Sequence, residues 1–406
     1  MSLIVQKFGG TSVGTLERIE KVAEIVAHES KTNQVLVVVS AMAGETNRLV
    51  SLAQGLSSEP NRLAMDMILA SGEQVSCGLL AIALEKRGIR ALPMLAFQAG
   101  IKTNEIFSDA RIESIQSNLL KRNLDRGIVP IVAGFQGIYE DEEHFEYLTT
   151  LGRGGSDTSG VALAAALKAD RCDIYTDVDG VYTADPRVVK KASLIKEISF
   201  SEMMELASLG AKVLHMRSVE IAAKYNVPLR VCSSFEPEKK GTLIVGEETM
   251  IEAPVVSSVT SSVSECLIKL EASAADAHFP ARILKPLADA QINVDIIARS
   301  AIDESKALCT FNLSVPRSDM NKCLELLAKF NPSVVLEKAA KLSIVGVGMK
   351  SHSGVAARMF QTLEKLEVPI LLITTSEIKV SVVIAETDLE RSIIEIHTAF
   401  GLDKTV

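Results

Sequence analysis

The chain has 406 residues, of which 47% are hydrophobic and only 4% aromatic, and its formal net charge at pH 7 is −8. This length predicts two or three domains, the acidic balance argues against nucleic acid as a bulk partner, and no apolar run approaches the ~20 residues of a membrane span. No signal peptide is evident, and the six cysteines form no C-x-x-C pair, so we expect reduced thiols in a cytoplasmic protein.

Up to about residue 245, short apolar runs alternate with amphipathic helical stretches. The expected strands are Ile4–Phe8, Val35–Ser40, Ala91–Leu95, Val129–Gly134, Cys172–Thr176 and Leu229–Ser233. The expected helices are Leu16–Glu29, Arg62–Arg87, Asp109–Arg126, Asp157–Lys168 and Ser201–Tyr225. This alternation predicts an α/β sandwich of three layers, with helices on both faces of a mostly parallel sheet. Ligands of such sheets bind beyond the carboxyl ends of the strands.

The composition changes at residues 235–254, where charged residues, Pro and Gly suggest a linker. Beyond the linker the sequence repeats itself, since Ile292–Ser300 aligns with Val368–Ser376. Each repeat reads β-α-β-β-α-β, the ferredoxin-like arrangement. The expected domains are an α/β domain, a linker with a possible first strand of the following region, and two ferredoxin-like units, over residues 1–245, 246–262, 263–338 and 339–406.

The first chemical motif, Lys7-Phe-Gly-Gly-Thr-Ser12, follows the first expected strand. Gly9 and Gly10 let a ligand approach backbone N–H groups, the following helix start favours an anion, and Lys7 adds a positive charge. These features suit a phosphate, but a tight strand-to-helix turn with a surface lysine explains them equally well. The motif is not a Walker A loop, because G-x-x-x-x-G-K-[ST] is absent.

The second motif is TTLGRGGSDT at residues 149–158, which leads into an expected helix. Its glycines place Arg153, Ser156 and Asp157 at the start of that helix, where an arginine suits bidentate binding of a carboxylate. Asp157 alone could be an N-cap. A cap needs neither an arginine nor three glycines before it, so a binding role is favoured. A dinucleotide fingerprint would need a third glycine where Asp157 stands.

The third motif, YTDVDGVYTADP at residues 175–186, holds more Asp, Gly and Tyr than a connecting loop needs. It is not an EF-hand, because Gly180 falls at the wrong position. A nucleotide could use its tyrosines for packing and its aspartates for the ribose or the metal shell. Lys212 is a further candidate cation, although an isolated lysine is more often solvated. Three weaker candidates are more easily explained as turn or cap residues: Ser40, Thr46 and Glu73.

Together these motifs favour phosphoryl transfer from ATP, a reaction that depends mostly on positioning and charge neutralisation. No obvious general base accompanies them. A carboxylate acceptor needs none, because its pKa of about 4 leaves it ionised at neutral pH, whereas an alcohol acceptor usually needs one. The residues therefore favour an ATP-dependent kinase of a small acidic metabolite, with Arg153 available to hold a second carboxylate.

In these motifs the chain resembles the aspartate kinase family of the amino-acid kinase superfamily. The resemblance rests on KFGGTSV (7–13), SAM (40–42), AGFQG (133–137), TTLGRGGSDT (149–158) and YTDVDGVYTADPR (175–187). It covers essentially the whole chain, and it implies that the two ferredoxin-like units are ACT domains. The implied reaction moves the γ-phosphoryl group of ATP to the β-carboxylate of L-aspartate. It begins the routes to lysine, through diaminopimelate, and to threonine and methionine.

The resemblance also implies roles for single residues. Lys7 and Lys212 would contact the phosphates, and Asp157 would orient the lysines and interact with the metal shell. Arg153 would grip the α-carboxylate of aspartate, and Glu73 would face its amino group. The other implied aspartate-binding residues are Thr46 and Ser156. The other implied nucleotide-binding residues are Gly9, Gly10, Ser40, Thr176, Asp177, Asp179 and Tyr182. The implied cofactors are ATP and Mg²⁺, the ion being held largely by phosphates, so no metal-ligand set is expected in the chain.

In the regulatory region the resemblance implies amino-acid effectors, threonine or lysine or both. The implied effector-binding residues are Asn293, Asp295, Thr374 and Thr375. The first ACT unit departs from the family pattern, because Ala275–His278 replaces a D-x-P-G turn and Arg299-Ser300 replaces a Gln-Asn pair. His278, Phe279 and Arg299 are bulkier than a bare glycine turn tolerates. We therefore expect effector binding at the first unit to be lost or retuned.

The assembly is expected to be at least a homodimer, because ACT sheets pair. Met250 lies where some relatives start a separate small subunit made only of the ACT region, which permits an α2β2 tetramer. An ordinary linker methionine explains Met250 at least as well.

Two other functions compete with an aspartate kinase. One is a kinase of the same superfamily that acts on glutamate or UMP, against which stand the tandem ACT units and the loop at 175–186. The other is a non-catalytic amino-acid sensor, which keeps the ACT pair beside an inactive kinase domain. The intact Lys7, Arg153 and Asp157 favour an active enzyme.

Overall fold

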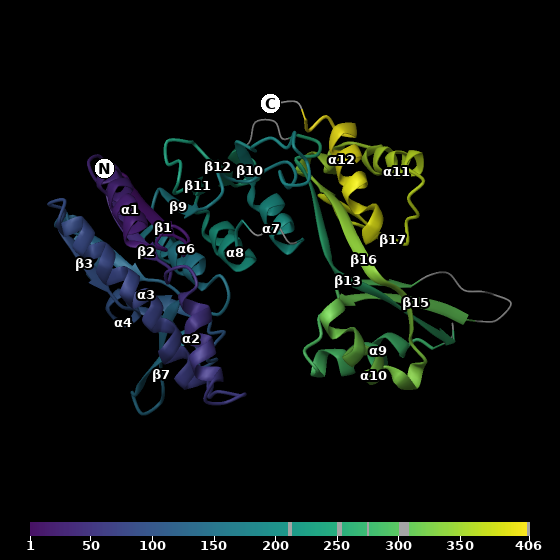
Figure 1. Cartoon of the computed structure of the whole chain (residues 1–406), viewed down its shortest axis with the longest axis horizontal. Helices are drawn as coiled ribbons and strands as arrows, with labels where there is room; N and C mark the ends of the chain where they lie inside the picture. Colours follow the sequence, from purple (N-terminus) through teal and green to yellow (C-terminus); the bar gives the residue numbers. More distant parts are fainter. Residues whose placement is uncertain (210–212, 250–253, 274–275, 300–307, 404–406) are drawn as a thin grey trace. The chain divides into compact units, whose positions relative to one another are not determined.

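The structure is a computed structural model that describes residues 1–209, 213–249, 254–273, 276–299 and 308–403, without the side chains of 350 and 351. It divides into two compact units, which are described separately here (Figure 1). The first comprises Met1–Val181, Leu194–Ser208 and the described part of Lys212–Ile251. The second comprises the described part of Glu252–Val406 together with Leu209 and Tyr182–Ser193, which lie within the first unit in sequence.

An eight-stranded sheet forms the centre of the first unit, in the order β10-β12-β11-β9-β1-β2-β6-β3. The strands are β1 (Leu3–Phe8), β2 (Gln34–Val39), β3 (Ala91–Met94), β6 (Val129–Ala133), β9 (Arg171–Thr176), β10 (Glu197–Ser199), β11 (Leu229–Ser233) and β12 (Thr242–Val245). All neighbours are parallel except β11 and β12. Nearly every residue of β1, β2 and β6 is buried, as expected for strands covered on both faces. The predicted α/β class with a mostly parallel sheet is confirmed.

Helices cover both faces of this sheet. The helices of the first unit are α1 (Leu16–Glu29), α2 (Glu45–Gln54), α3 (Arg62–Glu85), α4 (Ala96–Ala99), α5 (Asn118–Asp125), α6 (Gly155–Leu167), α7 (Phe200–Ser208), α8 (Met216–Tyr225) and the 3₁₀ turn η1 (Glu247–Thr249). Helices α1 and α3 pack together over β2 and β6, while α5 and α6 cover the other face and α8 packs on α6. By length and composition α3 could cross a membrane, but half of its most apolar stretch is buried inside this unit, as in a core helix.

One predicted helix of the first unit is wrong and another is divided. The segment 109–126, predicted as one helix, forms β5 (Ile112–Ile115) and then the shorter α5. Its β-branched isoleucines pair with β4 (Ile101–Thr103) in a small sheet β5-β4-β7-β8, which the sequence did not reveal. The other strands of that sheet are β7 (Gln136–Glu140) and β8 (Glu146–Thr150). The predicted helix 201–225 is represented by the separate helices α7 and α8.

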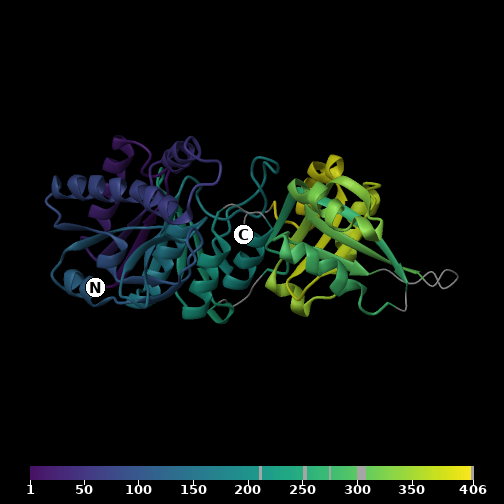
Figure 2. The ribbon, with the colours of Figure 1, turned by 90° about the horizontal axis from the view of Figure 1, so that it is seen from below.

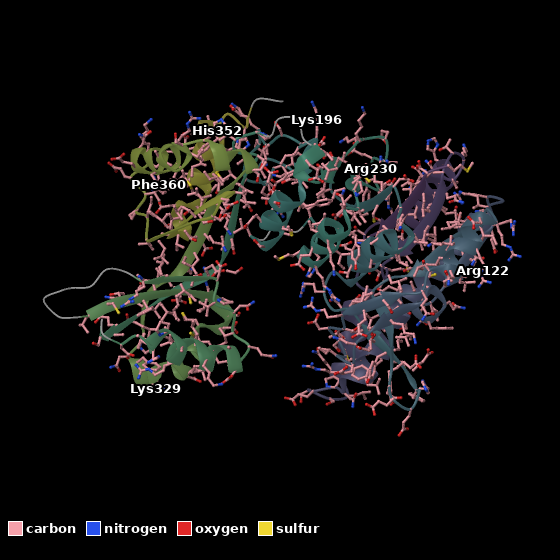
Figure 3. All side chains as sticks on the ribbon, turned by 180° about the vertical axis from the view of Figure 1, so that it is seen from behind. Arg122, Lys196, Arg230, Lys329, His352 and Phe360 are labelled. Carbon is pink, nitrogen blue, oxygen red and sulfur yellow. The ribbon has the colours of Figure 1, made fainter. Side chains whose placement is uncertain are left out.

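A buried ion cluster fastens β11 beside β9. The fully buried Asp173 accepts hydrogen bonds from Arg171 Nε at 2.6 Å and from Arg230 Nε at 2.9 Å. Figure 3 shows the side chains of the molecule and labels Arg230. Because two guanidinium groups share this carboxylate, its burial is compensated by charge-assisted hydrogen bonds.

The second unit is built on a six-stranded antiparallel sheet in the order β14-β15-β13-β16-β18-β17. Its strands are β13 (Ser258–Ser273), β14 (Ile296–Arg299), β15 (Leu308–Pro316), β16 (Ser333–Val345), β17 (Leu372–Thr375) and β18 (Lys379–Ala385). Its helices are α9 (Phe279–Asp289), α10 (Met320–Leu326), α11 (Val355–Lys365), α12 (Leu389–Ala399) and the 3₁₀ turns η2 (Arg317–Asp319), η3 (Ala328–Phe330), η4 (Val347–Ser351) and η5 (Glu386–Asp388). The long strands β13 and β16 run through both halves, so α9 and α10 cover one half of the sheet and α11 and α12 the other (Figures 1 and 2).

The segment Tyr182–Ser193 is part of the core of this second unit. Ala184 and Val189 are buried in the hydrophobic cluster that α11, α12 and β16 form. The Thr183 hydroxyl lies 2.9 Å from Nε2 of the buried His397, and the Thr183 carbonyl accepts a hydrogen bond from Val259 N–H. Burial lowers the pKa of His397 below its usual value, which favours the neutral ring in this position.

Candidate active site

The carboxyl ends of four parallel strands meet in the first unit. Strand β1 pairs with β2 on one side and with β9 on the other, so the chain leaves it at a topological switch point. Backbone hydrogen bonds join the loops that follow: Gly9 N–H donates to Tyr175, Ser40 N–H to Phe8 and Gly134 N–H to Val39, each at 3.0 Å. The motifs after β1, β2, β6 and β9 are therefore neighbours.

A pocket of about 320 Å³ lies at this edge. It is lined by Lys7, Gly10, Ser40, Ala41, Met42, Ala43, Gly44, Thr46, Glu73, Phe135, Gly152, Arg153, Gly154, Gly155, Ser156 and Asp157. The pocket thus gathers residues from the first two sequence motifs and the weaker candidates on one surface, although they are up to 150 residues apart in the chain.

Lys7 of the first motif and Asp157 of the second form an ion pair in the pocket lining. Their Nζ and Oδ1 atoms are 2.5 Å apart, and the two side chains are only 9% and 15% exposed. The Lys7 ammonium group is therefore the partner of this carboxylate oxygen. Asp157 lies in the first turn of α6, where a negative charge is favoured. The arrangement holds the ammonium group of Lys7 in place beside the pocket.

Glu73 is a buried carboxylate that α3 contributes to the pocket lining. Its Oε1 accepts a hydrogen bond from Ala41 N–H at 2.9 Å, whereas no hydrogen-bond donor to Oε2 is found in the described residues. Burial raises the pKa of Glu73 to about 7, against the opposing influence of the Ala41 N–H and the charge of Lys7. A buried acceptor with a free oxygen is suited to a cationic group of a ligand.

Arg153 stands on the glycine-rich loop and is exposed. Within the described part of the chain no carboxylate forms an ion pair with it, so its guanidinium group is available to an anionic ligand. The flanking Gly152 and Gly154 both have left-handed backbones, with φ of 74° and 72°. A Cβ on Gly154 would also lie 2.3 Å from the ring of His215, so this loop requires glycine there.

Several predicted residues lie outside the pocket lining. Gly9 borders it, since a Cβ there would lie 3.5 Å from Lys7 Nζ. Thr176, Asp177 and Asp179 follow β9, and Asp179 pairs with Lys239 at 2.9 Å. Two more predicted residues are not placed by this unit, because Tyr182 belongs to the second unit and Lys212 lies outside the described residues.

The predicted effector residues lie at opposite edges of the second unit's sheet. Asn293 and Asp295 precede the edge strand β14, whereas Thr374 and Thr375 lie on the other edge strand, β17. One chain therefore does not bring the two pairs together. Asp295 forms an ion pair with the buried Lys341 of β16. Of the departures from the family pattern, Arg299 has its guanidinium 5.7 Å from the ring centre of Phe311, and Ala275 and Ser300 lie outside the described residues.

The sequence did not single out every residue of the site. Phe135 lines the pocket with a left-handed φ of 69°, an unusual conformation for a phenylalanine. Its position in AGFQG, directly after a strand, is a signal that could have identified it. The buried Asp66 and the partly buried Arg217 hold the glycine-rich loop from behind, and no local motif marks them.

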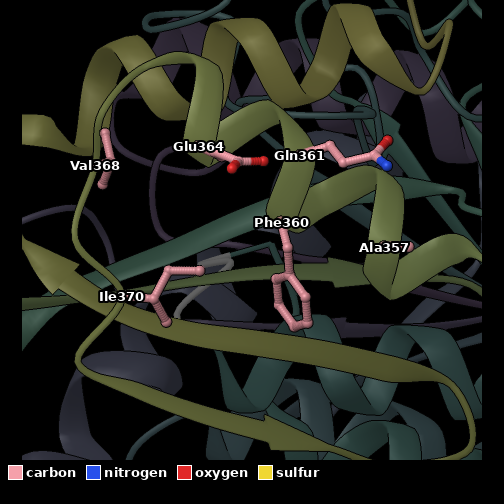
Figure 4. Close-up of a pocket in the computed structure, with 6 residues that line it drawn as sticks. All are labelled: Ala357, Phe360, Gln361, Glu364, Val368 and Ile370. Atoms are coloured by element: carbon pink, nitrogen blue, oxygen red, sulfur yellow. The ribbon is translucent and has the colours of Figure 1, made fainter.

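A second, larger groove of about 520 Å³ lies on the second unit (Figure 4). It is lined by Ala357, Phe360, Gln361, Glu364, Val368 and Ile370, between α11 and the segment before β17. Among the described residues that line this groove, Glu364 is the one titratable side chain, so they form no catalytic constellation.

Comparisons with known proteins identify relatives of both units of the chain. A model of the amino acid kinase family matches residues 2–233, and an ACT domain model matches residues 342–400. The aspartate kinase of Stutzerimonas stutzeri is 49% identical over 99% of this chain and 98% of its own length. The aspartokinase of Pseudomonas aeruginosa is 48% identical over the same shares, and aspartokinase 2 of Bacillus subtilis is 46% identical over 100% and 99%.

Solved structures show the same fold. Aspartokinase III of E. coli, in complex with aspartate and ADP, superposes with a TM-score of 0.79 at 27% identity, covering 98% of this chain and 99% of that one. Its complex with lysine and aspartate gives the same TM-score. Full-length similarity to several aspartate kinases and a matching fold lead to one assignment. The chain belongs to the aspartate kinase family.

Proposed function

We propose that this protein transfers the γ-phosphoryl group of ATP to the β-carboxylate of L-aspartate, which gives 4-phospho-L-aspartate and ADP. The observation that carries the proposal is one pocket with the Lys7–Asp157 ion pair, the buried carboxylate of Glu73 and the guanidinium of Arg153, which no carboxylate of the described residues pairs. An amino-dicarboxylic acid needs a partner for its ammonium group and one for its α-carboxylate. Glu73 and Arg153 are suited to these two tasks.

In the proposed reaction, an oxygen of the β-carboxylate attacks the γ-phosphorus while the bond from that phosphorus to the β,γ-bridging oxygen breaks. The acceptor is already ionised, so no proton has to be removed. The main obstacle is repulsion between two anions, and Lys7 lies where it can offset this charge. Thr46 and Ser156 would complete the aspartate side, and Lys212 would act with Lys7 on the phosphates.

The nucleotide would extend from the pocket toward the residues after β9. Gly9, Gly10 and Ser40 would approach the phosphates, and the remaining nucleotide contacts are proposed at Thr176, Asp177, Asp179 and Tyr182. Among the described residues no group of three His, Cys, Asp or Glu side chains could hold a metal. Asp157 is a single carboxylate in the pocket lining, which fits a Mg²⁺ held mainly by ATP phosphates and neutralising their charge.

The second unit would carry the regulation. E. coli aspartokinase III has been solved with lysine, and we propose that amino-acid effectors, threonine or lysine or both, act through the ACT region here. The proposed domains are those expected from the sequence, with Tyr182–Ser193 packed in the second unit. We further propose a cytoplasmic homodimer or α2β2 tetramer that serves lysine, threonine and methionine synthesis.

A hydroxylamine trap tests the reaction. Purified protein with L-aspartate and Mg-ATP should form aspartyl hydroxamate, whereas glutamate and UMP should give no phosphorylated product. If aspartate yields no acyl phosphate, the proposed function is wrong. Titration with threonine and lysine then tests regulation, and strong inhibition by either would contradict a first ACT site that has lost its effector.

A further inference from the structure

The loop that carries Arg153 cannot position this side chain by itself. Gly152 and Gly154 flank it, and glycine leaves the backbone more conformational freedom than any other residue. The following helix α6 also begins without a side-chain cap, because Gly154 occupies the N-cap position. A loop of this composition has a defined shape only if neighbouring elements fasten its backbone.

Asp66 of α3 fastens the loop where it leaves β8. Asp66 is fully buried and accepts four hydrogen bonds, two on each carboxylate oxygen. Thr150 provides two of the donors, its N–H at 2.9 Å and its hydroxyl at 2.7 Å, and Ser108 provides the other two at 2.9 Å. All four hydrogen bonds that this carboxylate accepts therefore come from the last residue of β8 and from the adjacent turn.

Arg217 fastens the next residue from the other side. Its two terminal nitrogens donate to the carbonyl oxygens of Leu151, at 2.8 Å, and Ala110, at 2.6 Å. Ala110 N–H in turn donates to the carbonyl of Thr150, so the two anchors share one turn. The carboxylate that approaches Arg217 is Asp109, 3.9 Å away and 68% exposed, whereas the Arg217 side chain is 11% exposed. The guanidinium group of Arg217 is thus held mainly by two neutral carbonyl groups, and it fixes their positions in turn.

The same turn of α8 touches the loop again beyond Arg153. The ring of His215 packs so closely against Gly154 that a Cβ there would lie 2.3 Å from it. His215 and Arg217 therefore contact the loop on either side of Arg153, at Gly154 and at Leu151. Two fixed points this close in sequence leave the intervening backbone little freedom.

From these contacts we infer that Asp66 and Arg217 are positioning residues, which fix the backbone of Thr150 and Leu151 and so set where Arg153 meets the acceptor. The inference rests on the proposed function for the identity of that acceptor. Neither residue lines the pocket, so each acts through the loop. A purely structural role would lower stability without distinguishing one substrate from the other, whereas a positioning role affects aspartate selectively.

Arg217→Met tests this inference, because methionine has a similar length but no N–H donors. We expect the KM for aspartate to rise about tenfold or more, since small displacements of a binding group are costly, while the KM for ATP changes less than about twofold. Guanidinium ion at low millimolar concentration should restore part of the aspartate affinity of Arg217→Ala. Hydrogen exchange of a peptide covering residues 150–156 should become faster in both variants.

Arg90→Met is the matched control, because Arg90 also donates to a backbone carbonyl but lies outside the pocket lining. It should leave both KM values unchanged. If Arg217→Met does not fold, Arg217→Lys keeps the charge but has a single donor nitrogen, and should give an intermediate rise in the aspartate KM.

Folded Arg217 variants with an unchanged aspartate KM, or with equal changes for both substrates, would overturn the inference. If the wild-type protein phosphorylates no aspartate, the proposed function fails separately, and exchange at 150–156 still decides whether Arg217 fixes the loop. Unchanged exchange there would also overturn the inference.

Discussion

Replacing Glu73 with glutamine removes a buried charge from the pocket while preserving its shape. The Ala41 N–H lies 2.9 Å from Glu73 Oε1, and a glutamine oxygen can accept the same hydrogen bond. What changes is the second oxygen, Oε2, which is buried and has no hydrogen-bond donor in the described part of the chain. In the proposed reaction this oxygen faces the ammonium group of aspartate.

The size of the effect follows from the titration of Glu73. Burial raises the pKa of Glu73 to about 7. If only the ionised form binds the ammonium group, the apparent KM for aspartate is about twofold above its high-pH value at pH 7 and about elevenfold above it at pH 6. Glutamine does not titrate. Its KM should be flat with pH and about 10- to 150-fold above the high-pH wild-type value, because a charged hydrogen bond contributes about 1.5–3 kcal/mol.

The measurement is the rate of ADP release at saturating Mg-ATP, with aspartate varied between pH 5.5 and 8. The β-carboxyl of aspartate, with a pKa of about 3.9, does not titrate in this range. Thermal melts of both proteins check the fold. A wild-type KM that does not change between pH 6 and 8 would refute the reasoning. A glutamine variant with the wild-type pH profile would also refute it.

Three further changes have defined outcomes. Lys7→Met should lower kcat about a hundredfold or more in the hydroxamate assay, with a folded protein by circular dichroism, because the developing phosphoryl charge loses its cation; near-wild-type turnover would contradict this role. Gly154→Ala should raise the aspartate KM and lower Tm more than Gly88→Ala does. Gly88 shares a positive φ (75°), but an added Cβ there would meet open space. Equal effects would show that the His215 ring packed against Gly154 is unimportant. Thr183→Val should cost about 1–3 kcal/mol in urea unfolding, because the His397 ring loses its partner, and an unchanged unfolding midpoint would count against that contact.

The sequence predicts the central sheet well, and the reason is physical. Strands covered on both faces, such as β1 and β2, must be continuous apolar runs, and this signal does not depend on distant residues. The segment 112–115 was misread because its choice of strand over helix depends on β4 beside it. Local preference there is too weak to decide between the two.

The residues of the site also fall into those that local sequence identifies and those that depend on distant contacts. Lys7 and Arg153 belong to contiguous motifs with glycines, so their chemistry can be read locally. Glu73 looks like an ordinary helical residue until the fold brings it to the N–H of Ala41, 32 positions away. Arg217 has no local mark, because its role consists of contacts with carbonyl groups from other elements.

The placement of Tyr182–Ser193 in the second unit has a consequence for how such proteins can be assembled from separate chains. A small subunit starting at Met250 would contain the ACT sheet but would lack Ala184 and Val189 from its hydrophobic cluster, and His397 would lose the Thr183 hydroxyl. We expect such a subunit to be unstable when made alone. A peptide of residues 182–193 should raise its Tm, as binding to a folded state does. If the peptide does not raise the Tm of the small subunit, residues 182–193 are dispensable for its stability. If the peptide does raise that Tm, the full-length chain acts as a folding partner for the small subunit. A stable small subunit would then require a full-length chain in the same cell.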